Sequence, residues 1–393
     1  MTDAVLTLNA GSSSLKFALF ELDGSTLNLT SQGQIEGLGT APRLVAKDPL
    51  GAVLADRRWS DPDLDHQAFF STLFGFVDDH LGGGRLCAIG HRIVHGGAAY
   101  SQPLLIDDHV LARLDALCAL APLHQAHNLA AVRWAKAARP GLPQAACFDT
   151  AFHHGHAEVV TRFALPRTWH DQGVRRYGFH GLSYEFVVGE LRKLDPVLAA
   201  GRVIIAHLGN GASLCAVQDG HSIDTTMGFT ALDGLMMGTR SGALDPGAVI
   251  YLAQQMGMEA VQAMLYEQSG LLGVSGLSSD MRVLLQSADP AAQEAIELFI
   301  FRIAREAGAL MSSMGGLDGI VFTAGIGENA PQIRTGVAER LAWTGLALND
   351  EANTGGRGLI SDPASRLKAW VIPTNEEAMI ARHTADLVGA ASR

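Results

Sequence analysis

The chain has 393 residues, a formal net charge of −11 and 48% hydrophobic residues. This length predicts about two domains, with enough apolar residues for a core in each. The acidic balance argues against nucleic acid or an anionic membrane surface as a partner. No uninterrupted apolar run reaches the roughly 18 residues of a membrane span. The four cysteines lie far apart, and the N-terminal stretch lacks the basic region of a signal peptide. We therefore expect a cytoplasmic protein with free thiols.

Residues 5–20 predict two strands joined by a tight polar turn. The backbone N–H groups, hydroxyls and single ammonium of this turn are the donors that a polyphosphate needs. An ordinary Gly/Ser hairpin is the alternative interpretation. The polar residues of the turn are Asn9, Gly11, Ser12, Ser13, Ser14 and Lys16.

Helices and strands alternate through the rest of the first half. Residues 31–66 predict an irregular surface insertion with one or two strands. The pattern then predicts helices at 66–81, 107–121 and 127–138, and strands at 86–89 and 144–148. Such alternation predicts α/β layers with ligand sites beyond the carboxyl ends of the strands.

The second half repeats the opening pattern. Strands predicted at 202–208 and 214–217 flank the turn GNGAS, and both predicted hairpins end in Asp-Gly. As a duplication, this predicts two related domains that each present a phosphate-facing hairpin to a shared cleft. Chance similarity between two hairpins is the alternative. Further helices are predicted at 246–268, 290–314, 331–343 and 376–389, and strands at 319–323 and 370–372.

Two local patterns in the second half suggest specific chemistry. Thr374 and Glu377 fit a capping box, which would tie Glu377 to the start of the last helix and leave Glu376 for another role. The segment GIGENA at 325–330 matches the dinucleotide fingerprint G-x-G-x-x-A, with Asp350 about 20 residues further on. No six-strand βαβ series follows it, and the chain has no P-loop motif, so a glycine-rich approach to a nucleotide is the favoured interpretation.

Polar residues recur at predicted strand ends and in Gly-flanked loops. Arg92 ends a buried strand, where an arginine is costly unless paired, so it is either half of a structural ion pair or an anion clamp. Candidate functional residues gather in such places more often than elsewhere. The others are His124, Asp149, His180, Asn210 and Arg240.

The segments LNAGSSSLK (8–16) and GHRIVHGG (90–97) closely resemble the two signature motifs of the acetate kinase family. Further segments resemble other family blocks, in family order, so that the resemblance spans nearly the whole chain. These are RYGFHGLSYE (176–185), HLGNGAS (207–213), MGTRSGALDPG (237–247), TAGIGEN (323–329) and TNEEAMIAR (374–382).

The resemblance implies an α/β fold, the duplicated ribonuclease-H-like (actin-like ATPase) fold, with two domains around a central cleft. It implies an N-terminal acyl-kinase domain at 1–149, with the C-terminal helix 377–393 packing back on it, and a nucleotide-binding domain at 150–376. The implied activity is reversible, direct in-line transfer of the γ-phosphoryl group of ATP to acetate, which gives acetyl phosphate and ADP. A cytoplasmic homodimer and Mg²⁺ (or Mn²⁺) are also implied.

By the same resemblance, Arg92 and Arg240 flank the acyl carboxylate and the transferring phosphoryl group, where planar guanidinium groups suit the charge on the equatorial oxygens. His180 adds a donor to that transition state, and His124 binds nearby. Asp149 matches the family's catalytic aspartate. Because acetate is already ionised at neutral pH, we favour an orienting or Mg²⁺-linked role for Asp149 over a general base.

The remaining matches concern the metal and the nucleotide. Asn9 and Glu376 match the family's magnesium positions, and hard oxygen ligands suit that ion. Ser12, Ser14 and Lys16 would contact phosphates. The nucleotide loops match His207, Leu208, Gly209, Asn210, Gly211, Asp280, Met281, Arg282, Gly325, Ile326, Gly327, Glu328 and Asn329.

The acyl group would lie against Val94, Leu123, Phe179 and Ala231. Ala231 stands where the family commonly has proline, which removes pocket wall and predicts room for propionate. Ala243 replaces a common acidic residue and predicts a change in how the Arg240 loop is held. Three alternatives stay open: a kinase for propionate or another short-chain acid, a nucleotide-gated binding module on the same fold, and a dehydrogenase that uses GIGENA.

Overall fold

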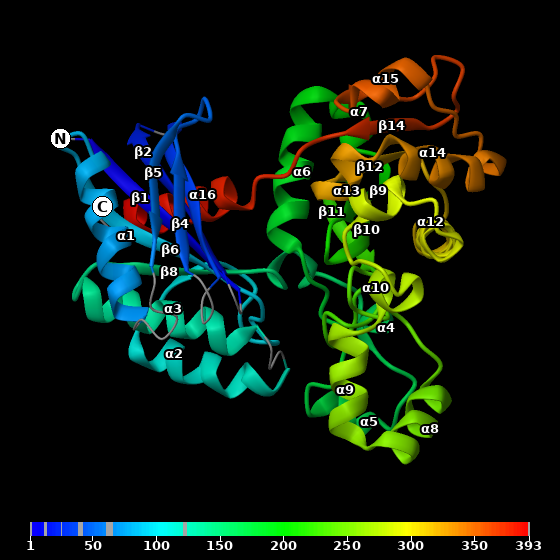
Figure 1. The fold of residues 1–393 in the computed structure, drawn as a ribbon, viewed down its shortest axis with the longest axis horizontal. Coiled ribbons are helices and arrows are strands. Elements are labelled where there is room, and N and C mark those ends of the chain that lie inside the picture. Colours follow the sequence, from blue (N-terminus) through cyan, green and yellow to red (C-terminus); the bar gives the residue numbers. More distant parts are fainter. Residues whose placement is uncertain are drawn as a thin grey trace. The chain divides into compact units, whose positions relative to one another are not determined.

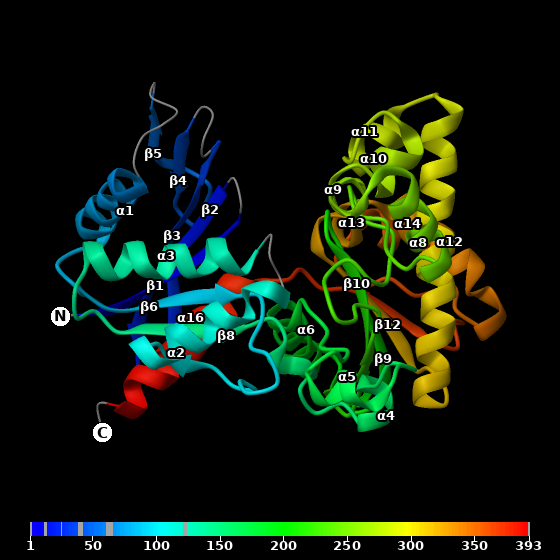
Figure 2. The same ribbon diagram turned by 90° about the horizontal axis from the view of Figure 1, so that it is seen from below.

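The structure is a computed structural model that describes residues 2–11, 14–24, 26–37, 42–59, 66–120 and 124–391 (Figures 1 and 2). The chain divides into two compact units. The first unit is Met1–Ala151 together with Asn375–Arg393, and the second is Phe152–Thr374. Every helix in the described part of the chain is too short or too polar to cross a membrane.

The first unit is built on an eight-stranded sheet with the order β5-β4-β3-β2-β1-β6-β8-β7. Strands β1 to β5 pair antiparallel with their neighbours in the sequence, whereas β1, β6 and β8 run parallel. The hairpin predicted at 5–20 and the strand predicted at 144–148 are confirmed, and β6 is longer than predicted. The bounds are β1 (Asp3–Ala10), β2 (Ser14–Asp23), β3 (Thr26–Glu36), β4 (Arg43–Lys47), β5 (Val53–Arg58), β6 (Arg85–Ile93), β7 (Leu104–Leu105) and β8 (Gln144–Phe148).

The prediction of an irregular insertion at 31–66 is wrong. Strands β3, β4 and β5 extend the sheet in regular antiparallel pairs, with Ile35 and Leu44 in the core. Gly33 lies inside β3, where a Cβ would come within 2.7 Å of the Phe17 ring. A glycine that is required for close packing inside a strand has the same appearance in the sequence as a turn glycine.

Helices cover both faces of this sheet (Figure 2). Leu6 and Leu8 of β1 pack with α1 and α3, whereas Val5 belongs to a separate cluster with Ala381 of α16. Consecutive strand residues point to opposite faces, so β1 contributes to both cores. The helices are α1 (His66–His80), α2 (Asp108–Asp115), the 3₁₀ turn η1 (Ala116–Leu120), α3 (Gln125–Ala138) and α16 (Glu376–Ala391).

The second unit contains a six-stranded sheet with the order β11-β10-β9-β12-β14-β13. Strand β9 pairs antiparallel with β10 and parallel with β12, just as β1 pairs antiparallel with β2 and parallel with β6. The same arrangement in both units supports duplication over chance similarity of two hairpins. The bounds are β9 (Arg202–Leu208), β10 (Ala212–Gln218), β11 (His221–Thr225), β12 (Gly319–Thr323), β13 (Gly358–Leu359) and β14 (Lys368–Val371).

The helices of the second unit follow most of the predicted ranges. The single helix predicted at 246–268 is divided at Gly257, whose φ of +86° ends α8. The elements are η2 (Ala151–His153), α4 (Glu158–Thr161), α5 (Arg167–Asp171), α6 (Gly181–Leu194), α7 (Pro196–Ala199), α8 (Pro246–Met256), α9 (Met258–Glu267), α10 (Gly270–Ser275), α11 (Met281–Gln286), α12 (Pro290–Met314), α13 (Ala324–Asn329), α14 (Pro331–Arg340), η3 (Ala342–Thr344) and α15 (Asp350–Gly355).

The capping box predicted for the last helix is wrong. The side chain of Asn375 accepts a hydrogen bond from the backbone N–H of Ala378 at 2.9 Å, which makes Asn375 the cap of α16. Among the described residues, the buried hydroxyl of Thr374 has no hydrogen-bond partner. The cap is therefore one residue later than predicted, and Glu377 is not held by a capping box.

Candidate active site

Three predicted site residues lie at the carboxyl ends of neighbouring parallel strands in the first unit. Asn9 is near the end of β1, Arg92 near the end of β6, and Asp149 directly follows β8. Strands β1, β6 and β8 are in parallel register, so their ends meet at one edge of the sheet. This is the edge at which open α/β sheets bind ligands.

Arg92 and Asp149 form a close ion pair at this edge. Arg92 Nη2 donates to Asp149 Oδ2 at 2.5 Å, and Nε donates to Oδ1 at 3.0 Å. Arg92 Nη1 donates to Asn9 Oδ1 at 3.2 Å, and Glu376 Oε2 lies 3.7 Å from Arg92 Nε. Burial alone lowers the pKa of Arg92, but the charges of Asp149 and Glu376 outweigh it and raise the pKa above its ordinary value. The guanidinium therefore stays charged in a fixed orientation.

Lys16 and Glu377 lie close to this ion pair. Lys16 stands opposite Asn9 in the β1–β2 hairpin. Burial raises the pKa of Glu377, and the neighbouring charge of Glu376 adds to the effect, while Lys16 and Arg92 act against it. The two glutamates at the start of α16 therefore differ, since Glu376 faces Arg92 and Glu377 gains a proton more readily than an exposed glutamate.

Other predicted residues of the first unit are placed only in part. The backbone N–H of Val94, a buried residue, donates to Asn128 Oδ1 at 2.9 Å. His124 precedes α3 and does not cap it through its side chain. Ser14 begins β2 and closes the turn by accepting from the N–H of Gly11. Ser12 and Leu123 lie outside the described residues.

Two histidines stack in the second unit. The rings of His180 and His207 are 4.1 Å apart at 17°. His180 Nδ1 is 2.8 Å from Ser213 Oγ, which is 2.5 Å from the hydroxyl of Tyr184. His207 Nδ1 is 2.8 Å from Ser183 Oγ. Burial raises the pKa of Tyr184, so this hydroxyl keeps its proton and its hydrogen bond to Ser213.

Arg240 lies in a loop, and both Arg240 and His180 lie close to Gly211. Arg240 Nη1 donates to the carbonyl oxygen of Ala231 at 2.7 Å. A Cβ on Gly211 would lie 3.3 Å from both Arg240 Nη2 and His180 Nε2, so Gly211 lets these two side chains approach the backbone. The loop is held by the backbone of Ala243, whose N–H donates to Gly234 and whose carbonyl accepts from Arg302. Backbone bonds thus hold the loop at the position where the family commonly has an acidic residue.

The remaining nucleotide-loop candidates lie on β9, α11 and α13. Leu208 and Met281 are buried, whereas the side chain of Arg282 is 85% exposed and paired with Asp280. The segment from Gly325 to Asn329, which includes Ile326 and Gly327, forms most of the short helix α13 directly after β12. Glu328 Oε1 accepts from the N–H of Thr374 at 3.3 Å, and Asn329 Nδ2 donates to Gly325. Gly209 and Asn210 follow β9, and the N–H of Gly238 donates to Asn210.

Arg334 supports this segment and was not predicted. It is fully buried and donates to the carbonyl oxygens of Gly327 and Glu328, at 2.8 and 2.9 Å, and to Asn353 Oδ1 at 2.7 Å. Burial lowers its pKa, and the partners named here are carbonyl and amide oxygens that carry no opposing charge. The signal in the sequence was an arginine within an apolar helical stripe that includes Ile333 and Val337.

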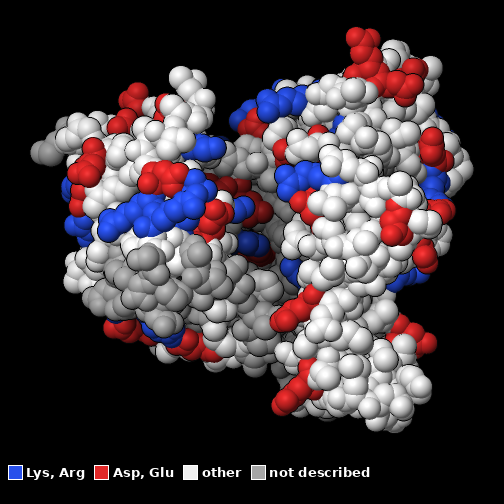
Figure 3. All heavy atoms as spheres, in the orientation of Figure 1, with Lys and Arg blue, Asp and Glu red and all other residues white. Residues whose placement is uncertain are grey.

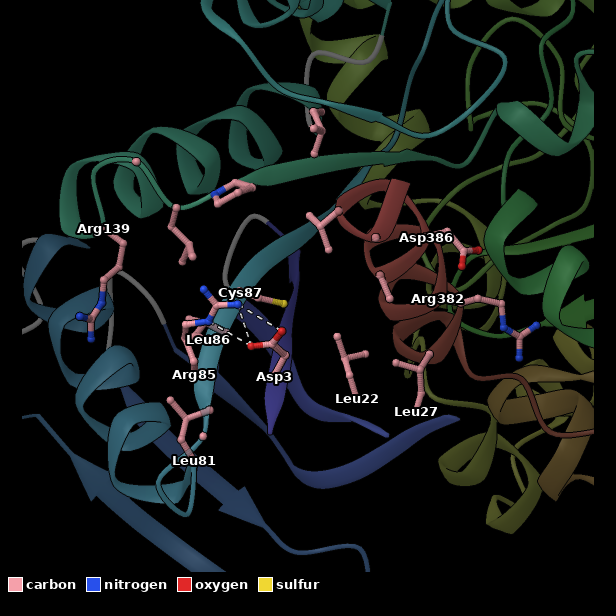
Figure 4. A pocket seen from close by; sticks show the side chains of 18 of the residues that line it. Asp3, Leu22, Leu27, Leu81, Arg85, Leu86, Cys87, Arg139, Arg382 and Asp386 are labelled. Carbon is pink, nitrogen blue, oxygen red and sulfur yellow. Dashed lines mark hydrogen bonds and ion pairs between the residues drawn. The ribbon is translucent and has the colours of Figure 1, made fainter. Parts of the chain in front are cut away.

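Figure 4 shows a large groove of the first unit. Its volume is about 1730 Å³, and its lining includes Asp3, Arg85 and Cys87. Asp3 and Arg85 begin β1 and β6, so the groove lies at the amino ends of the strands whose carboxyl ends carry Asn9 and Arg92. Its lining contains none of the predicted site residues.

The fold is that of the duplicated ribonuclease-H-like, actin-like class of kinases, and comparisons with known proteins agree. Residues 4–382 match the Acetokinase family, and the chain belongs to this family. It is 51% identical to an acetate kinase of Rhodopseudomonas palustris and 49% identical to one of Nitrobacter hamburgensis. These matches cover 98% of this chain, and 98% and 96% of the two relatives.

Solved structures show the same fold. A propionate kinase from Francisella tularensis has a TM-score of 0.90 at 38% identity. An acetate kinase from Porphyromonas gingivalis has a TM-score of 0.87 at 36% identity. Both matches cover 98% of this chain and 100% of the other. The expected fold class is therefore confirmed, and the dehydrogenase alternative is removed.

The raised pKa of Glu377 gives a testable pH dependence of stability. A carboxyl group whose pKa is higher in the folded state destabilises that state as the pH rises from 4.5, its ordinary value, through the raised value. Glu377→Gln removes this penalty. We expect the variant to have a higher free energy of unfolding than the parent at neutral pH, and the difference to vanish below the ordinary pKa.

Urea denaturation at neutral pH and at about pH 4 measures both values. Glu339→Gln, which changes an exposed glutamate, is the control and should show no such pH-dependent difference. A Glu377→Gln variant that is less stable than the parent at neutral pH would show that the charged carboxylate stabilises the fold.

Proposed function

We infer that the protein transfers the γ-phosphoryl group of ATP reversibly to acetate, giving acetyl phosphate and ADP. The observation that carries this function is the family match over residues 4–382, which includes every predicted transfer residue. Arg92 and Asp149 are at one sheet edge of the first unit, and His180 and Arg240 adjoin Gly211 in the second. Their presence disfavours a binding module without acyl transfer.

The proposed roles follow from the charges of the reactants. Acetate and the triphosphate repel each other, so the enzyme must supply positive charge where they meet. We propose that Arg92 and Arg240 supply it and that His180 adds a hydrogen-bond donor to the transferring group. Arg92 is oriented by Asp149, and Arg240 is anchored to the Ala231 carbonyl. Such preorganised donors need no rearrangement at the moment of reaction.

No proton has to move in this reaction. A carboxylate oxygen of acetate forms a bond to the γ-phosphorus while the bond from that phosphorus to the bridging oxygen of ADP breaks. Acetate is ionised at neutral pH and needs no general base. Both oxygens of Asp149 already accept hydrogen bonds from Arg92, which supports an orienting role for this carboxylate.

The nucleotide and acyl sites are proposed in the same way. Lys16, Ser12 and Ser14 would contact phosphates, and the loops at 207–211, 280–282 and 325–329 would hold the nucleotide. The acyl group would contact Val94, Leu123, His124, Phe179 and Ala231. We propose that the first unit is the acyl-kinase domain and that the second unit is the nucleotide-binding domain.

Substrate choice is the first test of the function. One methylene changes transition-state binding by only about 1–3 kcal/mol, so propionate is the alternative substrate. We expect acetate to be the better substrate by a modest ratio of kcat/KM, and Ala231→Pro to increase that ratio by restoring pocket wall. A hydroxamate assay across acids of increasing chain length measures both. Ala231→Gly, which enlarges the pocket, should shift the ratio the other way.

Two results would contradict these expectations. A strong acetate preference that does not change in Ala231→Pro would mean that residue 231 does not line the acyl pocket. No acyl phosphate from any short-chain acid would remove the proposed function.

The two arginines are the second test. Lysine keeps the charge but not the planar fork of donors, so Arg92→Lys and Arg240→Lys should each lower kcat on the order of 100-fold. Arg92→Ala is less informative because it leaves the buried Asp149 unpaired. Arg133→Lys and Arg340→Lys, which change exposed ion pairs in the two units, are matched controls. Wild-type kcat in either site variant would exclude that arginine from the transfer.

We propose that Asn9 and Glu376 hold Mg²⁺ or Mn²⁺ together with water and phosphate oxygens. Both present the hard oxygen donors that such ions prefer. The described residues contain no group of three acidic, histidine or cysteine side chains suited to a metal, which agrees with an ion held partly by substrate. When bound, the ion would neutralise phosphate charge.

Glu376→Gln should therefore raise the Mg²⁺ concentration for half-maximal activity more than Glu377→Gln does. Titration of activity with MgCl₂ measures the difference. Equal effects would exclude a specific role of Glu376 in metal binding.

We propose that the protein forms a homodimer through α8 and α9. None of the residues of α8, all of which the structure describes, is buried, and Ile250 and Tyr251 are both 60% exposed. Figure 3 shows mostly uncharged atoms over this part of the second unit. Sedimentation velocity should show a dimer that Ile250→Glu with Tyr251→Glu dissociates and Trp343→Glu, an exposed aromatic of η3, does not. A monomeric parent protein would remove this proposal.

We also propose that the protein acts in the cytoplasm. The four cysteines are free thiols, as expected for a reducing compartment. Cell fractionation that places the protein outside the cytoplasm would contradict this.

A further inference from the structure

A chain of hydrogen-bonded side chains in the second unit has no role in the proposed function so far. Ser222, on β11, lies at its centre. Ser222 Oγ is 2.8 Å from His153 Nδ1, 2.7 Å from His156 Nε2 and 3.2 Å from Cys215 Sγ. The other ring nitrogen of His153, Nε2, is 2.9 Å from the carbonyl oxygen of Phe179. This chain of hydrogen bonds therefore ends at Phe179, the residue directly before His180.

The chemistry of these groups fixes the directions of the hydrogen bonds made by His153 and His156. A carbonyl oxygen only accepts, so His153 Nε2 carries a proton and donates to Phe179. In a neutral ring Nδ1 is then an acceptor, and the single hydroxyl proton of Ser222 must point to it. His156 Nε2 must therefore donate to Ser222 Oγ.

Burial keeps this arrangement intact at working pH. It lowers the pKa of His153 to about 3, with a further contribution from His156, and lowers the pKa of His156 to about 4. Both rings are thus neutral, which the acceptor role of His153 Nδ1 requires. A metal site at these residues is not indicated, because no suitable group of three ligands occurs within the described ranges.

The hydrogen bond to Phe179 matters because of the backbone conformation of His180. The backbone of His180 has φ +61° and ψ +22°, the left-handed conformation that residues other than glycine rarely adopt. Such a conformation persists only where the surrounding structure holds it. The peptide that joins Phe179 to His180 is held by the His153 hydrogen bond, and the His180 ring is held separately by Ser213.

We propose that His153, supported by Ser222 and His156, is a positioning residue that holds the peptide before His180 and thereby sets the His180 imidazole for phosphoryl transfer. This inference rests on the proposed role of His180. His153 itself touches no reacting atom. Its effect is to fix the left-handed turn from which His180 reaches the site.

The first experiment reads the hydrogen-bond chain without using activity. In protein labelled with ¹⁵N-histidine, ring nitrogen shifts report the tautomer of each histidine. We expect His153 and His156 to be Nε2–H tautomers that do not titrate between about pH 6 and pH 8. An Nδ1–H tautomer at His153, or titration of His153 near the ordinary histidine value, would overturn the proposal.

The second experiment separates positioning from general stability. His153→Phe keeps a ring but has no donor, whereas His153→Gln keeps an N–H for Phe179. We expect His153→Phe to lower kcat on the order of 10-fold to 100-fold, with smaller changes in the KM values, and His153→Gln to recover much of the loss. The control His221→Gln, at an exposed histidine next to Ser222, should leave kcat unchanged.

A double-mutant cycle with His180→Ala decides whether the effect passes through His180. In the His180→Ala background, His153→Phe should cause no further loss. An equal fold loss in both backgrounds, or wild-type kcat in His153→Phe, would overturn the inference. If His153→Phe does not fold, Ser222→Ala, which keeps the ring but removes the hydroxyl that donates to His153 Nδ1, takes its place in the cycle.

Failure of the proposed function gives a different result. If His180→Ala has wild-type kcat, the proposed role of His180 in transfer is wrong, and the proposed positioning role of His153 is wrong as well. If His180→Ala is impaired but His153→Phe is not, only the present inference fails.

Discussion

The ion pair between Arg92 and Asp149 is the interaction on which the rest of the first unit's site depends. It joins the ends of two parallel strands, and Asn9 and Glu376 contact the same guanidinium from a third strand and from α16. A half-buried arginine without these partners would be costly, and the buried Asp149 without the arginine would be more so. The partners therefore fix the charge and the direction of the arginine before any anion arrives.

Two arginines of the second unit, Arg240 and Arg334, are held by other means. Arg240 is anchored by the carbonyl of Ala231, and the fully buried Arg334 is anchored by carbonyl oxygens and Asn353. Carbonyl groups satisfy guanidinium donors without adding a formal negative charge. In a unit proposed to bind a nucleotide this has a clear physical advantage, because a carboxylate near the phosphates would repel them. The opposite pKa directions of Arg92 and Arg334 reflect this difference.

The sequence allowed the elements with regular apolar periodicity to be predicted, and it failed where glycine or capping chemistry was ambiguous. Strands at 144–148 and 319–323 were predicted with the bounds that the structure has. One or two strands were expected at 31–66, but the regular pairing of β3 to β5 was not predicted. Gly33 of β3 serves close packing and not a turn. Motif resemblance predicted Arg92 as a site residue but could not distinguish an ion pair from an anion clamp, since its partner Asp149 is 57 positions away.

The supporting residues were the least predictable part of the site. His153 carries no pattern that separates it from the neighbouring histidines at 154 and 156, and its role depends on a serine that is distant in the sequence. Arg334 left a weak signal as a cation within an apolar stripe. Such residues act through long-range hydrogen bonds, whose partners local periodicity does not reveal.

The start of α16 shows how a shift of one residue changes the electrostatics of the site. Because Asn375 is the cap, Glu376 and Glu377 occupy the first two positions of the helix, where the helix dipole favours negative charge. The pKa of Glu377 is nevertheless raised, so burial and the charge of Glu376 outweigh the dipole, Lys16 and Arg92. Arg92 favours the charged form of Glu377 as well, but not by enough to offset burial and the charge of Glu376. Glu376 has the contact with Arg92, and Glu377 therefore carries the cost of the shared negative charge.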